Sequence, residues 1–371
     1  MRPLKQNFYP ITIALFFAFT TMQTNAQNLV TPRNVSPAAD VKQQIGLTEI
    51  VVNYSRPKVT LRGNDRTGKI WGQQIPWGFD QISFATGKGI PWRAGANENT
   101  TISFSDNVKI EGKDLSAGTY GLHMAVYEDG KVIVIFSSNH TSWGSYYYDE
   151  SEDVLRVETR MEDHPKTEAL TYDFIDYGTN HTVLALTWEN KIIPFKIEID
   201  AVELILQSYR NQLRSTPGFG TQAYVTAANY SLQNKTNYDE ALSWIDIAIS
   251  RKSNFNSIQV KANLLSATGK QEEADKMMED ALEIASNNEL NNYGYQLLGQ
   301  KKNEEAIEVF ELNAKRNPDD PNVHDSLGEA YKINGDNKKA IKSFEKSLSL
   351  DPPPNVKANS TALLKELGVV F

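Results

Sequence analysis

A repeat in the C-terminal half constrains this chain more than any other sequence feature. Four alanines recur at spacings of 33, 32 and 34 residues: Ala241, Ala274, Ala306 and Ala340. An apolar residue lies four positions after each of them. Periods of this length are typical of helix–turn–helix units that stack, because a lone helical pair cannot bury its apolar faces. We therefore predict four helical hairpins over 222–354 and a C-terminal capping helix over 355–371.

The last unit shows the pattern most clearly. Residues 323–333 and 338–350 carry apolar side chains at helical spacing, with Gly335 between the two stretches and Pro352 after them. Proline cannot continue a helix, so Pro352 marks the end of the unit. Gly328 and Ala340 are small residues at the predicted crossing of the two helices. We expect the helices to approach closely there.

The first 26 residues have the composition of a secretory signal peptide. A basic start is followed by an apolar core at 11–19 and by small residues up to Ala26. The apolar core is too short to span a bilayer, and no later stretch reaches spanning length, so we expect no transmembrane span in the mature chain. The prediction is a periplasmic or secreted protein, cleaved after Ala26. With no cysteine, the chain has no disulfide and no site for lipid attachment to a thiol.

The charge balance bears on the partner class. The formal net charge is −8, spread through 371 residues. A nucleic-acid partner would call for a basic patch or stripe, so we expect no nucleic acid among the partners.

Residues 27–200 predict an all-β domain, an antiparallel sandwich or open barrel. Apolar residues mostly alternate there, and Glu128-Asp129-Gly130 between two such runs is a strong hairpin signal. A second hairpin is expected from 101–105 and 107–111. Pro194 predicts an edge position or a bulge in the last strand. Residues 201–221 are expected to form a connecting helix and linker, so the fold class is a β domain followed by an α-solenoid.

The helical units resemble the tetratricopeptide repeat (TPR). The residues that carry the resemblance are Leu327, Gly328, Tyr331, Ala340, Phe344 and Pro352. The resemblance implies a concave groove, lined by the first helix of each unit, that binds a protein or peptide partner. The groove residues it implies are Thr226, Tyr230, Asn256, Gln259, Asn263, Asn288, Asn291, Tyr295, Asn322 and Asp325. Neutral amides suit hydrogen bonds to an extended peptide. Any single asparagine is better explained by a solvated helix, so groove binding is predicted for the set and not for one residue.

The N-terminal half resembles the domain-of-unknown-function family 2911. The resemblance rests on Tyr54 to Pro57, Trp92 to Glu98, Ala117 to Tyr120 and Glu152 to Arg156. That family is mainly from Bacteroidetes, is often exported and is sometimes fused to tetratricopeptide repeats. It implies no established activity. This chain departs from the family by an extra segment, Phe79 to Ile90, just before the Trp92 motif.

The aromatic residues around this motif predict a small-ligand surface. The candidate residues are Trp71, Trp77, Trp92, Arg93, Asn97, Glu98 and Trp143. Arginine can grip a carboxylate and tryptophan can stack on a sugar. The alternative is structural: Arg93 would pair with Glu98 or Asp153 and pin the loop, while Gly95 and Ala96 would let it turn tightly.

No catalytic residue, metal site or cofactor is predicted. The five histidines lack zinc-ligand spacing, and no Gly-x-Ser-x-Gly motif is present. The leading hypothesis is an exported, non-catalytic binding scaffold. The first alternative is a carbohydrate-binding module that depends on Trp92 but not on Trp188, since five of six tryptophans lie in the β domain. The second is a hydrolase that uses a cross-strand metal or an acidic cluster, although such a cluster is more often a solvated face. The cluster comprises Asp149, Glu150, Glu152 and Asp153.

Overall fold

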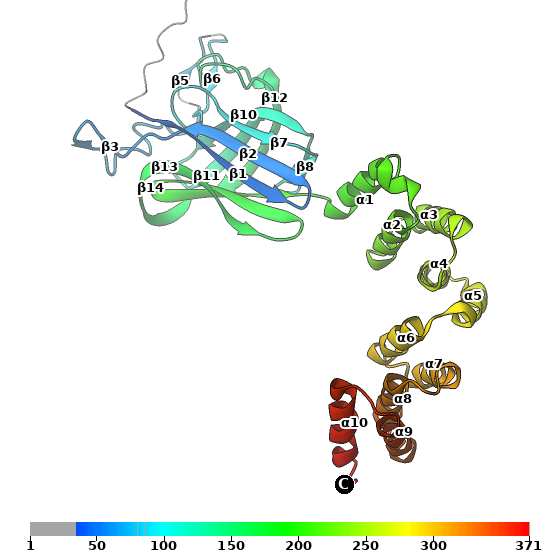
Figure 1. The fold of residues 1–371 in the computed structure, drawn as a ribbon. Coiled ribbons are helices and arrows are strands. Elements are labelled where there is room, and N and C mark those ends of the chain that lie inside the picture. The colour runs from blue at the N-terminus through cyan, green and yellow to red at the C-terminus, as the bar shows by residue number, and fades with distance from the viewer. Residues whose placement is uncertain (1–34, 80, 85, 371) are drawn as a thin grey trace, which may run out of the picture. The chain divides into compact units, whose positions relative to one another are not determined.

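The computed structural model describes residues 35–79, 81–84 and 86–370. The predicted signal peptide, residues 1–26, lies outside these described residues. The chain divides into two compact units, Met1–Ile199 and Asp200–Phe371. The first is built of strands and the second of helices (Figure 1).

The larger sheet of the first unit has six antiparallel strands. Their order across the sheet is β1 (Ala38–Ile45), β2 (Thr48–Ser55), β7 (Thr100–Phe104), β10 (Gly118–Val126), β11 (Lys131–Ser137) and β12 (Asp153–Arg160). Strand β2 alternates buried and less buried side chains, as expected of a strand with one face on the core. The other face of that strand is partly exposed.

A second antiparallel sheet covers the first. Its order is β13 (Glu162–Tyr177), β14 (His181–Glu198), β8 (Val108–Ile110) and β9 (Lys113–Leu115). Phe136 of β11 packs edge-on against Phe195 of β14 with ring centroids 6.1 Å apart. Tyr54 of β2 packs against Tyr172 of β13 at 4.9 Å. These contacts join the two sheets into an antiparallel β-sandwich, the fold class expected for this half.

Two short ribbons complete the β unit. Strands β3 (Thr60–Leu61) and β4 (Asn64–Asp65) form one, and β5 (Gln81–Ile82) and β6 (Gly89–Ile90) form the other. Both belong to the irregular stretch between β2 and β7. The second ribbon lies within residues 79–90, the segment that the resemblance predicts to be extra.

One predicted hairpin is confirmed and the other is wrong. Strands β10 and β11 pair through the Asp-Gly turn, where Gly130 has φ +86°. Strand β7, by contrast, pairs with β2 and β10, while β8 belongs to the other sheet beside β14. Residues 105–107 are therefore a corner between sheets, which alternation alone cannot distinguish from a hairpin. Pro194 lies in β14 after its pairing with β13 ends and before its pairing with β8 begins.

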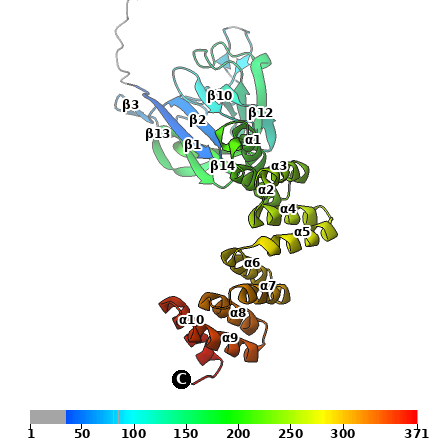
Figure 2. The same cartoon turned by 45° about the vertical axis from the view of Figure 1, so that its right-hand side comes forward.

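The second unit is a run of helices (Figure 2). Helix α1 (Ala201–Gln212) precedes four antiparallel pairs and a last single helix, α10 (Pro354–Glu366). The pairs are α2 (Gln222–Gln233) with α3 (Tyr238–Arg251), α4 (Phe255–Ala267) with α5 (Gln271–Ile284), α6 (Asn287–Gly299) with α7 (Asn303–Arg316), and α8 (Pro321–Ile333) with α9 (Asn337–Ser349). This is the TPR-like solenoid predicted from the repeat.

Small residues set the packing inside each hairpin. A Cβ on Gly328 would lie 2.6 Å from the ring of Phe344, and one on Gly294 would lie 2.5 Å from Phe310. Ala306 and Ala340 are fully buried on the facing helices. At α1, the Asp200 side chain caps the helix by accepting a hydrogen bond from the Glu203 backbone at 3.0 Å.

Within residues 35–370, apart from positions 80 and 85, no helix has the length and hydrophobicity needed to cross a bilayer.

Candidate functional site

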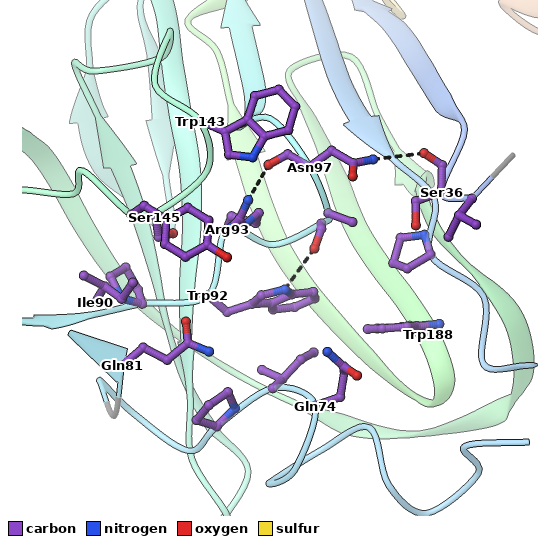
Figure 3. A pocket seen from close by; sticks show the side chains of 18 of the residues that line it. Ser36, Gln74, Gln81, Ile90, Trp92, Arg93, Asn97, Trp143, Ser145 and Trp188 are labelled. Atoms are coloured by element: carbon purple, nitrogen blue, oxygen red, sulfur yellow. Dashed lines mark hydrogen bonds between the residues drawn. The ribbon is translucent and has the colours of Figure 1, made fainter. Parts of the chain in front are cut away.

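The irregular stretch before β7 surrounds a cavity of about 380 Å³ in the β unit. Figure 3 shows that Arg93, Asn97 and Trp143 lie on one side of the Trp92 indole and Gln74 on the other. The lining combines indole rings, amides and cations. Such a concave site with a few converging polar groups is typical of small-molecule binding.

Trp92 is held in place by backbone and side-chain hydrogen bonds. Its backbone exchanges two bonds with Met124 of β10, at 2.9 and 2.8 Å. Its indole N–H donates to the carbonyl of Gly95 at 3.1 Å. The ring stacks on Trp188 with centroids 6.2 Å apart, and Trp71 packs edge-on behind both rings. The Trp92 side chain is therefore fixed before any ligand arrives.

Arg93 is held by a ring and a backbone, not by a carboxylate. Its Nη1 donates to the carbonyl of Asn97, and its Cζ lies 4.7 Å from the centroid of the Tyr146 ring. A Cβ on Gly144 would lie 2.1 Å from that Cζ, so only glycine leaves room for the guanidinium. Across the described residues Arg93 forms no ion pair with a carboxylate, and Asp153 pairs instead with Arg156 at 2.6 Å.

The turn that carries the motif differs from the structural alternative in which Gly95 and Ala96 allow the tight bend. The left-handed residues are Ala94 (φ +48°) and Asn97 (φ +63°). The Ala94 carbonyl accepts hydrogen bonds from Thr100 and Tyr172, at 3.1 and 2.9 Å, which hold this strained conformation. Gly95 is needed for space, because its Cβ would lie 2.4 Å from the Thr100 hydroxyl.

The cavity gathers four of the seven predicted ligand-binding residues. Trp92, Arg93, Asn97 and Trp143 line it. Trp71 lies behind Trp92 and Trp188, the indole of Trp77 lies against Gly72, and Glu98 is outside the lining. None of these last three is among the described residues that line the cavity.

Several lining residues were missed from the sequence. They are Ser36, Lys58, Arg66, Gln74, Gln81, Ser145, Tyr146 and Trp188. Lys58, Arg66 and Gln74 lie in the same glycine-containing stretch as the predicted tryptophans, which was the available signal. Trp188 comes from β14, and only tertiary folding brings it to the cavity. It is consequently unsuitable as the ligand-independent control that the carbohydrate hypothesis assumed.

A buried serine–histidine pair lies beside the cavity. His123 Nδ1 is 2.9 Å from the hydroxyl of Ser145, and both residues are 2% exposed. Burial, aided by the nearby charge of Arg93, lowers the pKa of His123 to about 3. The imidazole therefore stays neutral near pH 7 but is a weak base, poorly matched to activating a serine.

The acidic cluster is engaged in local structure. Asp153 accepts from Tyr148 and Arg156, both at 2.6 Å, and its burial raises its pKa. Glu150 pairs with Lys88, Asp149 caps a short 3-10 helix, and Glu152 accepts from Asn139. Outside the undescribed positions, no group of three or more histidine, aspartate or glutamate residues could hold a metal ion. Each of the four carboxylates therefore has a local hydrogen-bond or ion-pair partner.

The predicted groove residues lie on the first helices α2, α4, α6 and α8. Those exposed are Thr226, Asn256, Asn263, Asn288, Tyr295 and Asn322; Tyr230, Gln259 and Asn291 are half-buried. Asp325 is only 5% exposed, and its carboxylate accepts from Asn359 at 2.9 Å and from Ser360. Tyr230 packs edge-on against Tyr209 of α1.

Side-chain hydrogen bonds connect successive first helices. Gln259 of α4 donates to Gln296 of α6 at 3.0 Å. Tyr295 of α6 lies 3.1 Å from both Ser326 and Glu329 of α8. Glu329 and Asn359 were missed, yet each lies 34 residues after a predicted groove residue, so the repeat offset could have identified them. The groove side is thus a connected polar row.

The fold and the two sites define a class of protein: an antiparallel β domain joined to a tetratricopeptide-type solenoid. Comparison with family models agrees. Residues 36–197 match the family described as "Protein of unknown function (DUF2911)", and residues 256–288 and 322–354 match the tetratricopeptide repeat. The chain thus has an N-terminal region that matches the DUF2911 family, followed by regions that match the tetratricopeptide repeat, which confirms both resemblances.

Three solved structures illustrate the similarity of parts of the chain to known proteins. YrrB, described as a TPR protein with an unusual peptide-binding site, is 18% identical over 43% of this chain and 84% of its own, with a TM-score of 0.27. The C-terminal part of a TPR repeat-containing protein from Cytophaga hutchinsonii is 22% identical over 43% and 61%, with a TM-score of 0.29. MamA from Desulfovibrio magneticus is 22% identical over 35% and 75%, with a TM-score of 0.24. A comparison with curated proteins finds no match.

Proposed function

We propose that this chain is an exported, non-catalytic scaffold whose repeats hold a protein or peptide partner. The tetratricopeptide repeats support a protein-binding role, since solenoids of this kind use their concave face for binding. The observation that carries the proposal is a hollow of about 250 Å³ between the first helices α4 and α6.

The chemistry of this hollow fits a peptide backbone. Asn256 and Gln259 of α4 face Asn292 and Gln296 of α6 across it. A primary amide both donates and accepts hydrogen bonds, as does a peptide group. Phe255 lines the same hollow and supplies an apolar contact for a side chain of the partner. An extended peptide could therefore be bound along its backbone with modest side-chain selectivity.

Site-specific photo-crosslinking in the producing cell would test the proposal. A photoreactive residue at Asn256 is expected to give discrete adducts with a partner protein. The matched control is Gln300, an exposed amide at the end of α6 whose side chain makes no hydrogen bond in the described structure. Absence of adducts at Asn256, or equal adducts at both positions, would refute the groove as the binding site.

Export is the second element of the proposal. The apolar core at 11–19 and the small residues up to Ala26 support cleavage by a signal peptidase. N-terminal sequencing of the purified protein from cell fractions would test this. The expected mature start is Gln27, in the periplasm or the medium; an intact start in the cytoplasm would contradict it.

A second candidate function is small-ligand binding by the β domain. It is favoured by the cavity of about 380 Å³ and by the immobilised Trp92 and Arg93 that line it. Ligand binding should perturb tryptophan fluorescence, because Trp92 and Trp143 both line the cavity. A silent fluorescence and thermal-shift screen over a chemically diverse ligand set would count against this function.

A further inference from the structure

The charge of the β-domain cavity is opposite to that of the whole chain. Among the residues that the structure describes, its lining contains Lys58, Arg66 and Arg93 and no aspartate or glutamate. The chain as a whole carries 46 acidic and 38 basic residues. A concave site lined by charges of one sign concentrates the electrostatic field and attracts ligands of the opposite charge. An anionic group is therefore the complement that this cavity selects.

Two of the three cations keep donors for a ligand. The Nε and the second terminal nitrogen of Arg93 have no acceptor within the described part of the chain, and Lys58 has no side-chain partner there. Arg66 differs, since it donates to the Val59 and Lys58 carbonyls and to Gln74 at 2.8 Å. Arg66 thus contributes charge and orients Gln74. A planar guanidinium with free donors suits a carboxylate.

The remainder of the lining suits a hydroxylated ring. Trp92 and Trp143 supply indole surface, and Gln74, Gln81 and Asn97 supply amides around it (Figure 3). Amides can form hydrogen bonds with hydroxyl groups, and an indole ring can pack against the apolar C–H face of a sugar ring. A cavity of about 380 Å³ lies near the lower end of the usual range for small-molecule sites. This size favours one or two rings over a long chain.

We propose that the cavity binds a small acidic sugar, one or two rings carrying a carboxylate. The proposal rests on the small-ligand function of the β domain and gives it a chemical class. Arg93 and Lys58 hold the carboxylate, the indoles of Trp92 and Trp143 contact the ring, and Gln74 and Gln81 bind hydroxyl groups. No bond is made or broken in this role.

Calorimetric titration of the full chain with matched sugars tests the class. The probes are glucuronate and galacturonate, their neutral counterparts glucose and galactose, and benzoate as a carboxylate without a sugar. We expect the uronates to bind about tenfold more tightly than the neutral sugars, with an affinity that falls as salt is raised.

Pairs of variants, one inside and one outside the lining, test whether uronates bind in this cavity. Arg93→Gln should weaken uronate binding about tenfold, because it removes a charge-assisted hydrogen bond. Arg160→Gln, a change at an exposed arginine of β12 outside the lining, should not. Lys58→Gln should weaken binding about threefold, whereas Lys69→Gln in the same stretch should not. Lys58 is exposed and unpaired among the described residues, so its variant reports on binding even if Arg93→Gln fails to fold.

The outcomes distinguish failure of the acidic-sugar proposal from failure of the small-ligand function on which it rests. Equal binding of uronates and neutral sugars, with no effect of Lys58→Gln, would leave the cavity a ligand site and overturn the acidic class. Binding of benzoate but of no sugar would overturn the sugar class. Silence of all five probes would overturn the acidic-sugar proposal, and silence of the diverse screen as well would overturn the small-ligand function itself.

Discussion

The two units of this chain are stabilised by contacts that differ in sequence separation: long in the β unit and short in the helical unit. In the β unit, Phe136 contacts Phe104, Tyr120 and Phe195, so one ring joins segments from both sheets. In the helical unit, Phe344 packs against Gly328 of the same hairpin, only 16 residues away. Damage to a long-range core should spread through the whole unit. Loss of stability in one helical hairpin should be confined to that hairpin and the adjacent ones, because solenoids are stabilised by nearest-neighbour interfaces.

Truncation of one core ring in each unit gives the largest expected effect. Phe136→Ala and Phe344→Ala should each cost about 3–5 kcal/mol, because both rings are fully buried. Hydrogen exchange followed by mass spectrometry should show loss of protection across all strands for the first variant and only around α8 to α10 for the second. Loss of protection throughout the solenoid in Phe344→Ala would break the comparison.

Acid should destabilise the β unit through His123. Burial and the charge of Arg93 lower the pKa of this imidazole to about 3, below its ordinary value of 6.5. Between these values the unfolded chain binds a proton that the folded chain does not, so stability falls as pH falls through this window. At pH 5 the loss from His123 alone is about 2 kcal/mol. Denaturant titrations at pH 7 and 5 should show it, and His123→Gln should reduce the difference; an unchanged difference would contradict the assignment.

The space beside Arg93 can be tested with a pair of glycines. Gly144 and Gly112 both have left-handed φ, +60° and +78°, so alanine strains either position by about 1–2 kcal/mol. Only at Gly144 does the new methyl group meet Arg93; at Gly112 nothing lies within 4 Å. Gly144→Ala should therefore also weaken ligand binding at the cavity, by about the tenfold expected for Arg93→Gln. Equal ligand affinity in the two variants would show that Arg93 is not positioned by this contact.

The smallest expected effect separates capping from groove residues. Asn254 caps α4 by accepting from the Ser257 backbone at 2.9 Å, so Asn254→Ala should cost about 1 kcal/mol in local stability. Asn256, two residues further, is exposed, and Asn256→Ala should change stability by less than about 0.5 kcal/mol while weakening partner binding. Hydrogen exchange of α4 and a binding assay together would distinguish them. The reverse pattern would remove Asn256 from the groove.

The sequence separation between the residues that pack together also determines which features could be predicted from sequence. The hairpins follow from the repeat, because Gly328, Ala340 and Phe344 lie within one unit and recur in its neighbour. The Asp-Gly turn at 129–130 identified the β10–β11 hairpin for the same local reason. The corner at 105–107 was misread, since local alternation carries no information on which sheet a strand joins.

The residues of the candidate site also divide into those that local sequence identifies and those that only tertiary folding brings together. The Trp92 to Asn97 motif stands out by composition and lines the cavity. Trp188 reaches the same cavity from β14, and nothing near it in the sequence marks it as a partner of the motif. Glu98 and Trp77, chosen because they are near in sequence, do not line it. Which way each side chain points depends on the packing of the whole domain.

The ribbon β5–β6 makes part of the cavity wall, through Gln81 and Ile90, and Phe84 within the same segment stacks on Tyr146 at 5.3 Å. The sequence resemblance predicts that this segment is an insertion relative to the family. A family member without it would keep the Trp-Arg motif but lose this wall, leaving a wider mouth. Ligand size could then diverge between family members by insertion or deletion at one loop, with the recognition motif unaltered.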